Sequence, residues 1–499
     1  MNDRFRLANY FNTLLLFQGR SCSIVFNPKR SLGVPMGRYA HIKTRPIATF
    51  ALIIVNVAVY AITSYQRFFM EISDYWVSAG GFVPSLIAVP TQLYRILSSM
   101  FLHADFFHIL FNMYFLYLFG RAVEDVLGRW RFLALYLASG VAASIFHTAF
   151  SFLGGATAYV IPAIGASGAI SGVLGAYLIL FPGTSLVMAW PILYFPVFFR
   201  MKAAYYLIFW FATQVIYGYA RLGGSTAVFA HAGGFIAGIA LLPLVVSRER
   251  IIQFRLARQQ ALFPAYVIFT PAPARSAGLG RTTKTVMAVL LASLLFGAAY
   301  ASSGLSIRGD IKSATIQYSF EGIPYMDYVG FQLANLEGQL ASVSLDETRI
   351  LLNRLYAAKL LYDKDKADHD VSLTNWNTTL LMRVGGRPAT VVAVELAVIS
   401  FNGKYDGDGF LSHGTGELET QVILIDYYGR PSVSDYMVHY SFELASRTVN
   451  LTYITQYAGF LALVATAFAL AVVLTKDRDL TLIGEEPERA WRPFPPYHV

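Results

Sequence analysis

Long apolar stretches dominate this chain, and they limit the folds that are open to it. A helix that crosses a bilayer needs about 20 mostly apolar residues, and eight stretches of the 499-residue sequence meet that need. They are Pro46–Tyr65, Phe106–Val126, Phe132–Phe152, Ala163–Phe181, Ala203–Ala220, Ala227–Val246, Thr285–Gly304 and Tyr453–Thr475. The apolar run Leu186–Phe199 contains prolines, and we expect it to be an interfacial connector. With 56% apolar and only 14% charged residues, the chain is predicted to be a polytopic membrane protein and not a disordered one.

The positions of the basic residues indicate how these spans are oriented. Eight bases precede the first span, and loops of the same parity carry most of the others. These loops hold Arg129 and Arg131; Arg200 and Lys202; Arg248, Arg250, Arg255, Arg258, Arg275, Arg281 and Lys284; and Lys476 and Arg478. Because loops rich in Lys and Arg stay in the cytoplasm, we expect both termini there, in a bacterial inner (plasma) membrane. The net charge of +9 thus reflects topology, and no nucleic-acid partner is expected.

The spans divide the chain into seven parts. They are a cytoplasmic basic N-terminal segment (1–45), a six-span core (46–246), a cytoplasmic basic linker (247–284), a seventh transmembrane helix (285–304), an extracytoplasmic domain (305–452), an eighth transmembrane helix (453–475) and a cytoplasmic tail (476–499). In the outer domain, a capping box at Ser344–Glu347 predicts a helix that runs to Tyr362. Val391–Ser400 and Gln421–Tyr428 have the composition of strands. We therefore expect a small α+β domain outside the membrane.

Three spans carry polar side chains, which are costly inside a bilayer. His108 and Asn112 lie one helical turn apart in the second span, Ser167 lies in the fourth and His231 in the sixth. All three spans run from outside to inside, and His108, Ser167 and His231 lie within the first turn or two. At a rise of 1.5 Å per residue these groups are expected at one depth, roughly 5–10 Å below the outer surface. A shared layer predicts a single site.

The residue types in this layer suit nucleophilic acyl transfer. A serine hydroxyl needs a base to take its proton, and His231 is the candidate base for Ser167. No Asp or Glu lies within the fourth or sixth span, so a Ser–His dyad is expected in place of a triad. His108 and Asn112, together with backbone N–H groups around Ser167, are suitable donors to an oxyanion.

Glycines surround the candidate serine and line both helices that carry the dyad. Gly165 and Gly168 lie on either side of Ser167 and would let a substrate approach the backbone closely. Two small-xxx-small faces are present, formed by Gly168 and Gly172 in the fourth span and by Gly234 and Gly238 in the sixth. If these faces meet, Ser167 comes within reach of His231.

Four segments of the six-span core resemble the rhomboid intramembrane serine proteases. They are His103–Asn112 (HADFFHILFN), Gly120–Gly128 (GRAVEDVLG), Gly165–Tyr177 (GASGAISGVLGAY) and Ala230–Gly238 (AHAGGFIAG). The resemblance covers about Pro46 to Val246, and the order and spacing of the segments are specific to that family. It implies a rhomboid-like six-helix core. With the two further transmembrane helices and the α+β outer domain, which lie outside the resemblance, the expected fold is an all-α polytopic membrane protein with a small α+β extracytoplasmic domain.

The resemblance also implies a function, that of a serine endopeptidase which cleaves transmembrane segments of other membrane proteins near the outer face. By this likeness Ser167 would be the nucleophile and His231 the general base. His108 and Asn112, with the Ser167 backbone N–H, would stabilise the oxyanion. The supporting residues would be Gly165, Gly168 and Gly234. No metal or cofactor is implied, and the partners would be transmembrane substrates within the lipid bilayer.

Other parts of the core take roles from the same likeness, and two positions depart from the family pattern. The fifth span would be the lateral gate for a substrate helix with helix-breaking residues, and Ala220–Thr226 would resemble the cap. Tyr94-Arg95 stands where the family usually has a Trp-Arg pair. Ser171 stands where many relatives have an aromatic residue that stacks on the histidine. The second departure leaves open what orients His231.

Two other functions fit parts of the sequence. A non-catalytic rhomboid-like protein would bind transmembrane clients for sorting or quality control, but such proteins usually lack the serine or the histidine. A transporter would show internal repeats and broken helices near the midplane, and we find no repeat.

His147 in the third span has no matching motif and is interpreted as structural. Glu124 and Asp125 are interpreted as anchors to Arg129 and Arg131.

Three roles stay open for the outer domain, which could recruit substrates, restrict access or sense outside conditions. Because the eighth span returns this domain to the membrane, it is held near the mouth of the site, which favours recruiting or gating.

A calcium loop is suggested by Asp406-Gly407-Asp408-Gly409 together with Glu417. However, Phe410 and Leu411 replace a required ligand and a required glycine, so no metal site is expected.

Overall fold

A computed structural model describes residues 45–192, 195–223, 227–262, 278–332, 346–384, 390–425 and 430–485. Within this part of the chain, six helices are long and apolar enough to cross a membrane. They are Ile47–Arg67, Phe106–Leu127, Arg129–Gly154, Val228–Val245, Arg281–Ser302 and Leu451–Leu480. The chain is therefore a multi-pass membrane protein. The basic segment before the first span, the capping residue Ser344 and the tail beyond residue 485 lie outside the described residues.

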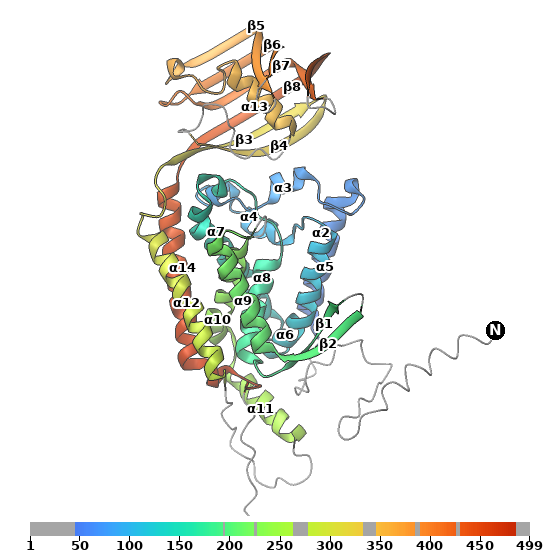
Figure 1. Ribbon diagram of the computed structural model, residues 1–499, viewed down its shortest axis with the longest axis vertical. Helices are drawn as coiled ribbons and strands as arrows, with labels where there is room; N and C mark the ends of the chain where they lie inside the picture. Colours follow the sequence, from blue (N-terminus) through green and yellow to red (C-terminus); the bar gives the residue numbers. More distant parts are fainter. Residues whose placement is uncertain are drawn as a thin grey trace, which may run out of the picture. The chain divides into compact units, whose positions relative to one another are not determined.

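Each of the eight predicted spans falls on a helix (Figure 1). In chain order these helices are α2 (Ile47–Ser64), α5 (Phe106–Phe115) continuing through a π-helical turn into α6 (Arg121–Leu127), α7 (Arg129–Phe150), α8 (Ser167–Leu180), α9 (Ala203–Ala220), α10 (Val228–Val245), α12 (Arg281–Ser302) and α14 (Leu451–Ala471). Shorter or peripheral helices are α3 (Asp74–Gly80), α4 (Arg95–Ser98), α11 (Arg248–Leu262) and α15 (Asp477–Leu480). Of the predicted spans, α8 and α9 are the two outside the set of six.

The helix α8 is shorter than the predicted fourth span for a local reason. Ala163 pairs with Phe82 in a β-bridge, and Gly165 has φ +129°, so helical geometry begins only at Ser167. Every later residue of α8 is buried, which places this 14-residue helix inside the bundle. The other end of α8 is capped by the chain that follows α14. Thr481 Oγ1 donates to the Ile179 carbonyl at 2.7 Å, and the amides of Leu482 and Ile483 donate to the Leu180 carbonyl.

The two predicted glycine faces meet, as the sequence led us to expect. A Cβ on Gly234 would lie 1.9 Å from the Gly168 carbonyl oxygen, and one on Gly238 would lie 1.9 Å from that of Gly172. The backbones of α8 and α10 therefore approach more closely than any larger residue allows.

The predicted interfacial connector between α8 and α9 contains a β-hairpin that the sequence analysis did not foresee. Its strands β1 (Ser185–Ile192) and β2 (Phe195–Lys202) are antiparallel, with Pro191 opposite Pro196. Proline lacks an N–H group for a ladder, but in a two-stranded ribbon each strand is an edge strand and tolerates it. Prolines alone therefore did not exclude strand pairing here.

The buried carboxylate of Glu124 corrects another expectation. Its oxygens accept hydrogen bonds from the amides of Ala48 and Thr49, both at 2.8 Å, and from Thr49 Oγ1 at 2.7 Å. Glu124 therefore does not anchor its helix to Arg129 and Arg131. It caps the start of α2, which has no acidic residue in its first turn and no side-chain cap of its own. A negative charge there satisfies amide groups that the helix itself leaves without partners.

As far as the structure describes it, the polar region after α12 folds into a six-stranded antiparallel sheet with one α-helix, α13. Its elements are β3 (Asp310–Phe320), β4 (Ile323–Gln332), α13 (Asp346–Ala357), β5 (Asp370–Val384), β6 (Thr390–Tyr405), β7 (Leu411–Ile425) and β8 (Pro431–Asn450), with strand order β4-β3-β8-β7-β6-β5. The two predicted strands lie within β6 and β7 as far as the structure describes them, while α13 ends five residues before Tyr362. Leu351, Leu352 and Leu355 of α13 belong to the domain core.

Two adjacent helices connect this sheet domain to the rest of the chain. The helix α12 leads into β3, and β8 leads into α14, with Asp310 paired to Asn450 where the strands begin and end. Figure 1 shows α12 and α14 side by side beneath these strands. Asn450 ends β8 and caps α14, because its side chain accepts from the Tyr453 amide at 2.8 Å. The change from strand to helix is therefore abrupt and fixed.

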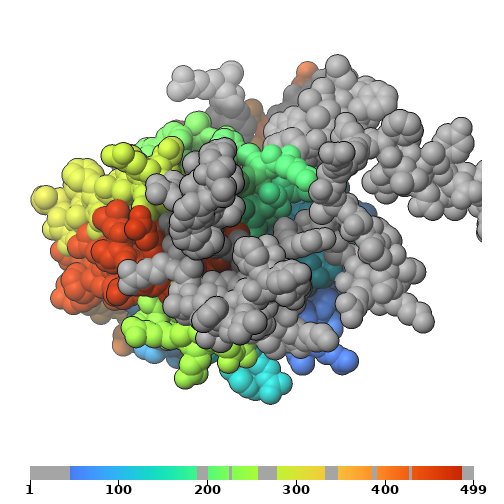
Figure 2. Space-filling model, turned by 90° about the horizontal axis from the view of Figure 1, so that it is seen from below, coloured from blue at the N-terminus to red at the C-terminus, as the bar shows by residue number. Residues whose placement is uncertain are grey.

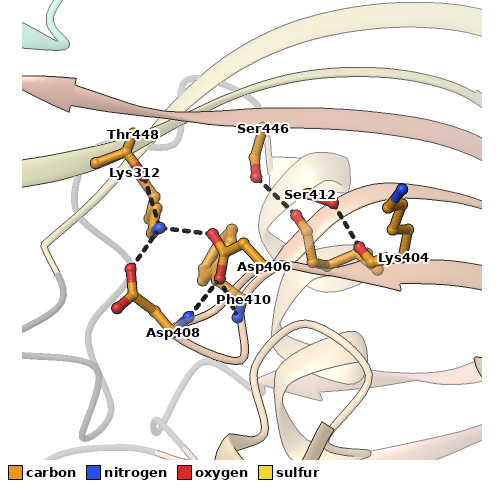
Figure 3. Close-up of polar contacts among 9 residues, drawn as sticks. Lys312, Lys404, Asp406, Asp408, Phe410, Ser412, Ser446 and Thr448 are labelled. Atoms are coloured by element: carbon orange, nitrogen blue, oxygen red, sulfur yellow. Dashed lines mark hydrogen bonds and ion pairs between the residues drawn. The ribbon is translucent and has the colours of Figure 1, made fainter. Parts of the chain in front are cut away.

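The loop that suggested a calcium site instead holds a buried lysine (Figure 3). Lys312 Nζ lies 2.5 Å from Asp406 Oδ2 and 2.8 Å from Asp408 Oδ2, and it also donates to Thr448 Oγ1 at 2.7 Å. Burial by itself would lower the pKa of Lys312, but the two carboxylates outweigh it and raise the pKa above its ordinary value. An ammonium group thus occupies the place beside these carboxylates that a metal ion would take.

Replacing Lys312 by methionine is expected to destabilise the sheet domain by about 1–3 kcal/mol, because two neighbouring carboxylates lose their cation. The measurement is thermal unfolding of the full-length protein, with Lys404→Met at an exposed position of β6 as the control. Because folding raises the pKa of Lys312, the stability that its ammonium group contributes is complete below 10.5, the ordinary pKa of lysine. This stability is lost as the pH rises through the higher pKa of the folded protein. Equal unfolding temperatures for both variants at neutral pH would contradict the prediction.

Candidate active site

The two residues of the predicted dyad are in direct contact. Ser167 is the first residue of α8, and His231 lies in the first turn of α10. The distance from Ser167 Oγ to His231 Nε2 is 2.7 Å, a short hydrogen bond. The close approach of α8 and α10 at their glycine faces brings the two side chains this near.

A third residue, Gln214 of α9, hydrogen-bonds to the other ring nitrogen of the imidazole. His231 Nδ1 lies 2.9 Å from Gln214 Oε1. The amide nitrogen of Gln214 donates to Thr213 Oγ1 at 3.2 Å and to the Trp210 carbonyl at 3.5 Å, which leaves Oε1 as the acceptor. The Nδ1 atom of His231 then carries the proton, and Nε2 presents its lone pair to the serine hydroxyl.

Gln214 was missed by the sequence analysis, although a signal for it existed. It is a buried amide inside a predicted span, and such a group needs a reason to be there. The aromatic neighbour of His231 also comes from α9, since the Trp210 ring centroid lies 6.1 Å from that of the imidazole. Ser171, at the position where the resemblance led us to expect an aromatic residue, instead donates to the Ser167 carbonyl at 2.6 Å. One helix therefore supplies both contacts that orient His231.

The side chain of His108 lies beside the same serine. A Cβ on Gly165 would be 2.8 Å from His108 Nε2 and 3.4 Å from Ser167 Oγ, so the two groups flank Gly165. Asp105 caps α5 by accepting from the His108 amide at 2.8 Å, and the Ala104 amide donates to His108 Nδ1 at 3.3 Å. Because Nδ1 accepts, Nε2 carries the proton and can act as a donor.

The other predicted oxyanion donors are available as well. Asn112 is buried, and its Nδ2 atom has no hydrogen-bond partner among the residues that the structure describes. Buried donors without a partner are uncommon, and a catalytic role is one of the explanations for such a group. Ser167 opens α8, so its amide N–H belongs to the first turn, whose amides have no partner within the helix.

A small cavity of ≈ 40 Å³ reaches Ser167. Its lining includes Gly165, Phe82, Met100 and His147. The volume exceeds what one water molecule requires, so a water molecule has room beside the serine. His147, interpreted from the sequence as structural, therefore lies at the edge of the candidate site. No group of three or more His, Cys, Asp or Glu side chains is placed to hold a metal within the described ranges.

The three supporting glycines each lie where a larger residue does not fit. Gly165 has φ +129°, a conformation that favours glycine, and a Cβ there would meet His108. A Cβ on Gly168 would lie 2.5 Å from the Ala143 Cβ, which brings α7 against α8. Gly234 allows α10 to reach the Gly168 carbonyl. These positions set the distances among the polar groups.

Known proteins are similar in sequence to this part of the chain. Residues 90–248 match the rhomboid domain. Rhomboid protein 1, mitochondrial, of Saccharomyces cerevisiae is 32% identical over 203 residues, which are 40% of this chain and 54% of the yeast protein. Rhomboid protease GluP of Bacillus subtilis is 41% identical over 102 residues (20% of this chain, 18% of GluP), and Rhomboid protease AarA of Providencia stuartii is 29% identical over 148 residues (26% and 50%). The chain thus spans about half or less of the length of these relatives.

Proposed function

Since the chain belongs to the rhomboid family, we propose that it is an intramembrane serine endopeptidase, with Ser167 as nucleophile and His231 as general base. The observation that carries the proposal is the 2.7 Å contact between Ser167 Oγ and His231 Nε2, with Nδ1 of the same imidazole held at 2.9 Å by Gln214. A serine within reach of an oriented base is the arrangement that nucleophilic acyl transfer needs.

In the proposed first step, Ser167 Oγ attacks the carbonyl carbon of the scissile peptide bond. His231 Nε2 takes the hydroxyl proton as the new C–O bond forms. The negative charge that develops on the carbonyl oxygen is stabilised by His108 Nε2–H, Asn112 Nδ2 and the Ser167 amide. The imidazolium then gives its proton to the leaving nitrogen, and the C–N bond breaks to leave an ester on Ser167.

In the second step, a water molecule hydrolyses this ester. His231 takes a proton from the water, whose oxygen attacks the ester carbonyl through the same oxyanion contacts. The proton returns to Ser167 Oγ as the C–O bond of the ester breaks. The cavity of ≈ 40 Å³ beside Ser167 supports this step, because it leaves space for the water within a buried region.

Gln214→Leu is expected to lower the rate of substrate cleavage about 10- to 100-fold, because the imidazole loses the partner that fixes its tautomer and orientation. Gln214→Glu keeps an acceptor opposite Nδ1 and should recover most of that loss. Ile216→Ala, on the exposed face of α9, is the matched control and should cleave at the wild-type rate. The measurement is the initial cleavage rate in liposomes. A wild-type rate for Gln214→Leu would mean that α9 does not orient the base.

The proposed topology has both termini in the cytoplasm of a bacterium, eight transmembrane helices and the sheet domain outside. Two basic loops expected in the cytoplasm lie together, because Arg129 and Arg131 share one hollow of ≈ 510 Å³ with Arg250. Figure 2 views the molecule from this end, with α11 in yellow-green. Loops of this composition stay on the cytoplasmic side, which puts Ser167 near the outer face.

The substrates we propose are single transmembrane segments of other membrane proteins that carry helix-breaking residues near the outer face. The test is to place the purified protein in liposomes with such a segment and to map the products by mass spectrometry. Cleavage near the outer end of the segment supports the proposal. Stable binding of an uncleaved segment would overturn it in favour of a non-catalytic client-binding protein.

A further inference from the structure

The edge strand β4 of the sheet domain packs against the loop that joins α2 to α5. Figure 1 shows β4 next to α3, a short helix of this loop. The ring of Tyr328 is buried in a cluster with Val83, Leu86 and Val89. Beside it, Ser78 Oγ donates to the buried Asp327 Oδ1 at 3.2 Å. The contact thus combines an apolar centre with a polar neighbour.

Arg95 connects this contact to the shape of the loop. Its side chain is buried, and Nη1 donates to the carbonyl oxygens of Ser78 at 2.6 Å and Gly81 at 3.0 Å. The guanidinium carbon lies 5.9 Å from the centroid of the Tyr328 ring. Because the face of an aromatic ring attracts a cation, Tyr328 stabilises the charge that holds the two ends of this turn together.

The same loop holds the backbone just before Ser167. Phe82 and Ala163 exchange two backbone hydrogen bonds, at 2.9 and 2.7 Å. The amide of Gly165 donates to the Ser99 carbonyl at 2.8 Å. Phe82, Ser99 and Gly165 all line the cavity that reaches Ser167. The turn that presents the nucleophile is therefore built against the loop that β4 covers.

The sheet domain also contacts the other segment that leads to Ser167. A Cβ on Gly330 of β4 would lie 2.1 Å from Val160 Cγ1, so strand and segment touch without space between them. Tyr159 shares a 2.5 Å hydrogen bond with Thr455 at the start of α14. Tyr159 and Val160 also form one apolar cluster with Ile311 of β3 and Val449 of β8. Both segments that fix the Gly165–Ser167 turn thus rest on the sheet domain or its supporting helix.

We propose that Tyr328 of the sheet domain is a positioning residue for Ser167. Docking of β4 on the α2–α5 loop keeps the Gly165–Ser167 turn in its reactive geometry, so the domain sets the rate of the chemical step. This inference rests on the proposed protease function. It differs from a recruiting role, in which the domain would change substrate binding and leave the chemistry untouched.

The test compares Tyr328→Ala with Tyr328→Phe, which keeps the ring, and with Leu381→Ala, an exposed position on the far edge strand β5. Cleavage of a generic transmembrane substrate in liposomes gives kcat and KM, and the rate of fluorophosphonate labelling reports on Ser167 without a substrate helix. Tyr328→Ala should lower kcat and the labelling rate about tenfold, because small displacements of reacting groups are costly. KM should stay within about twofold of wild type, since the substitution leaves the contacts that bind the substrate helix unchanged.

Tyr328→Phe and Leu381→Ala should react at the wild-type rate. If Tyr328→Ala does not accumulate in the membrane, Ser78→Ala is the replacement variant. It removes the hydrogen bond to Asp327 from the loop side and should also lower the rate of fluorophosphonate labelling. A raised KM with unchanged kcat and labelling rate would overturn the inference and indicate recruitment. If wild type is active and no variant slows, the positioning role is wrong. If wild type itself neither labels nor cleaves, the proposed function fails and this inference fails with it.

Discussion

Ser167→Ala should lose fluorophosphonate labelling completely and at least about 1,000-fold in the rate of substrate cleavage, because no other group replaces an activated nucleophile. The probe would form a covalent bond to the hydroxyl oxygen of Ser167, because this hydroxyl is hydrogen-bonded to His231 Nε2 at 2.7 Å and can give its proton to that base. His231→Ala should give a loss of similar size, and the double variant should be no worse than either one, because residues that act as a unit are not additive. Labelling is followed by in-gel fluorescence on membranes.

The matched control for this prediction is Ser171→Ala, one helical turn further along α8. Ser171 Oγ donates to the Ser167 carbonyl and makes no contact with the imidazole that the structure records. This variant should label and cleave at rates close to wild type. Equal labelling of Ser167→Ala and wild type would reject Ser167 as the nucleophile, whatever Ser171→Ala does.

Glu124→Ala is expected to cost about 3–5 kcal/mol of stability, the largest loss that we predict for a residue outside the dyad. The carboxylate accepts from two amides and one hydroxyl at the start of α2, at 2.7–2.8 Å. Its removal leaves buried donors without partners at the positive end of a helix. The measurement is the unfolding temperature of the purified protein in detergent, together with the yield of inserted protein.

Glu249→Ala removes an exposed carboxylate from the first turn of α11 and is the control. Exposed substitutions of this kind usually change stability by less than about 0.5 kcal/mol. Arg129→Ala should be equally mild, although the sequence alone suggested that Arg129 pairs with Glu124. If Arg129→Ala destabilises the protein as much as Glu124→Ala does, the capping account of Glu124 is incorrect.

The sequence was sufficient to predict the contact between Ser167 and His231. Span parity placed both residues at one depth, and the glycine faces of α8 and α10 indicated which helices approach closely. Both signals can be recognised within a single helix, the first from the position of a residue along its span and the second from the four-residue spacing of the glycines. The role of Gln214 depends on the rotation of α9 relative to α10, which no pattern within either helix determines. Its amide could have been recognised as a polar group inside a span, but its partner could not.

Where the sequence misled, the true partner lies far away along the chain. Glu124 has bases nearby in sequence, yet it bonds to amides some 75 residues earlier. Backbone amides at a helix start carry no sequence signature, whereas arginines do, so the nearer charges were favoured. Strand β3 was not predicted either, although its burial alternates from Ala314 to Ser319; its first residues, Ile311–Ala314, are buried without alternation and include Lys312. Long-range pairing with β8 stabilises that strand, and local composition does not encode such pairing.

The hydrogen bonds that Thr481, Leu482 and Ile483 make to the end of α8 have a consequence for how this protein can be shortened. The helix that begins with Ser167 has its last carbonyls satisfied by residues some 300 positions later in the chain. A fragment trimmed to the family-matched region, residues 90–248, would keep every group of the dyad and lose these partners. The residues after α14 are thus a structural component of the helix bundle that contains Ser167 and His231, and the 90–248 fragment is expected to be less stable than the full chain.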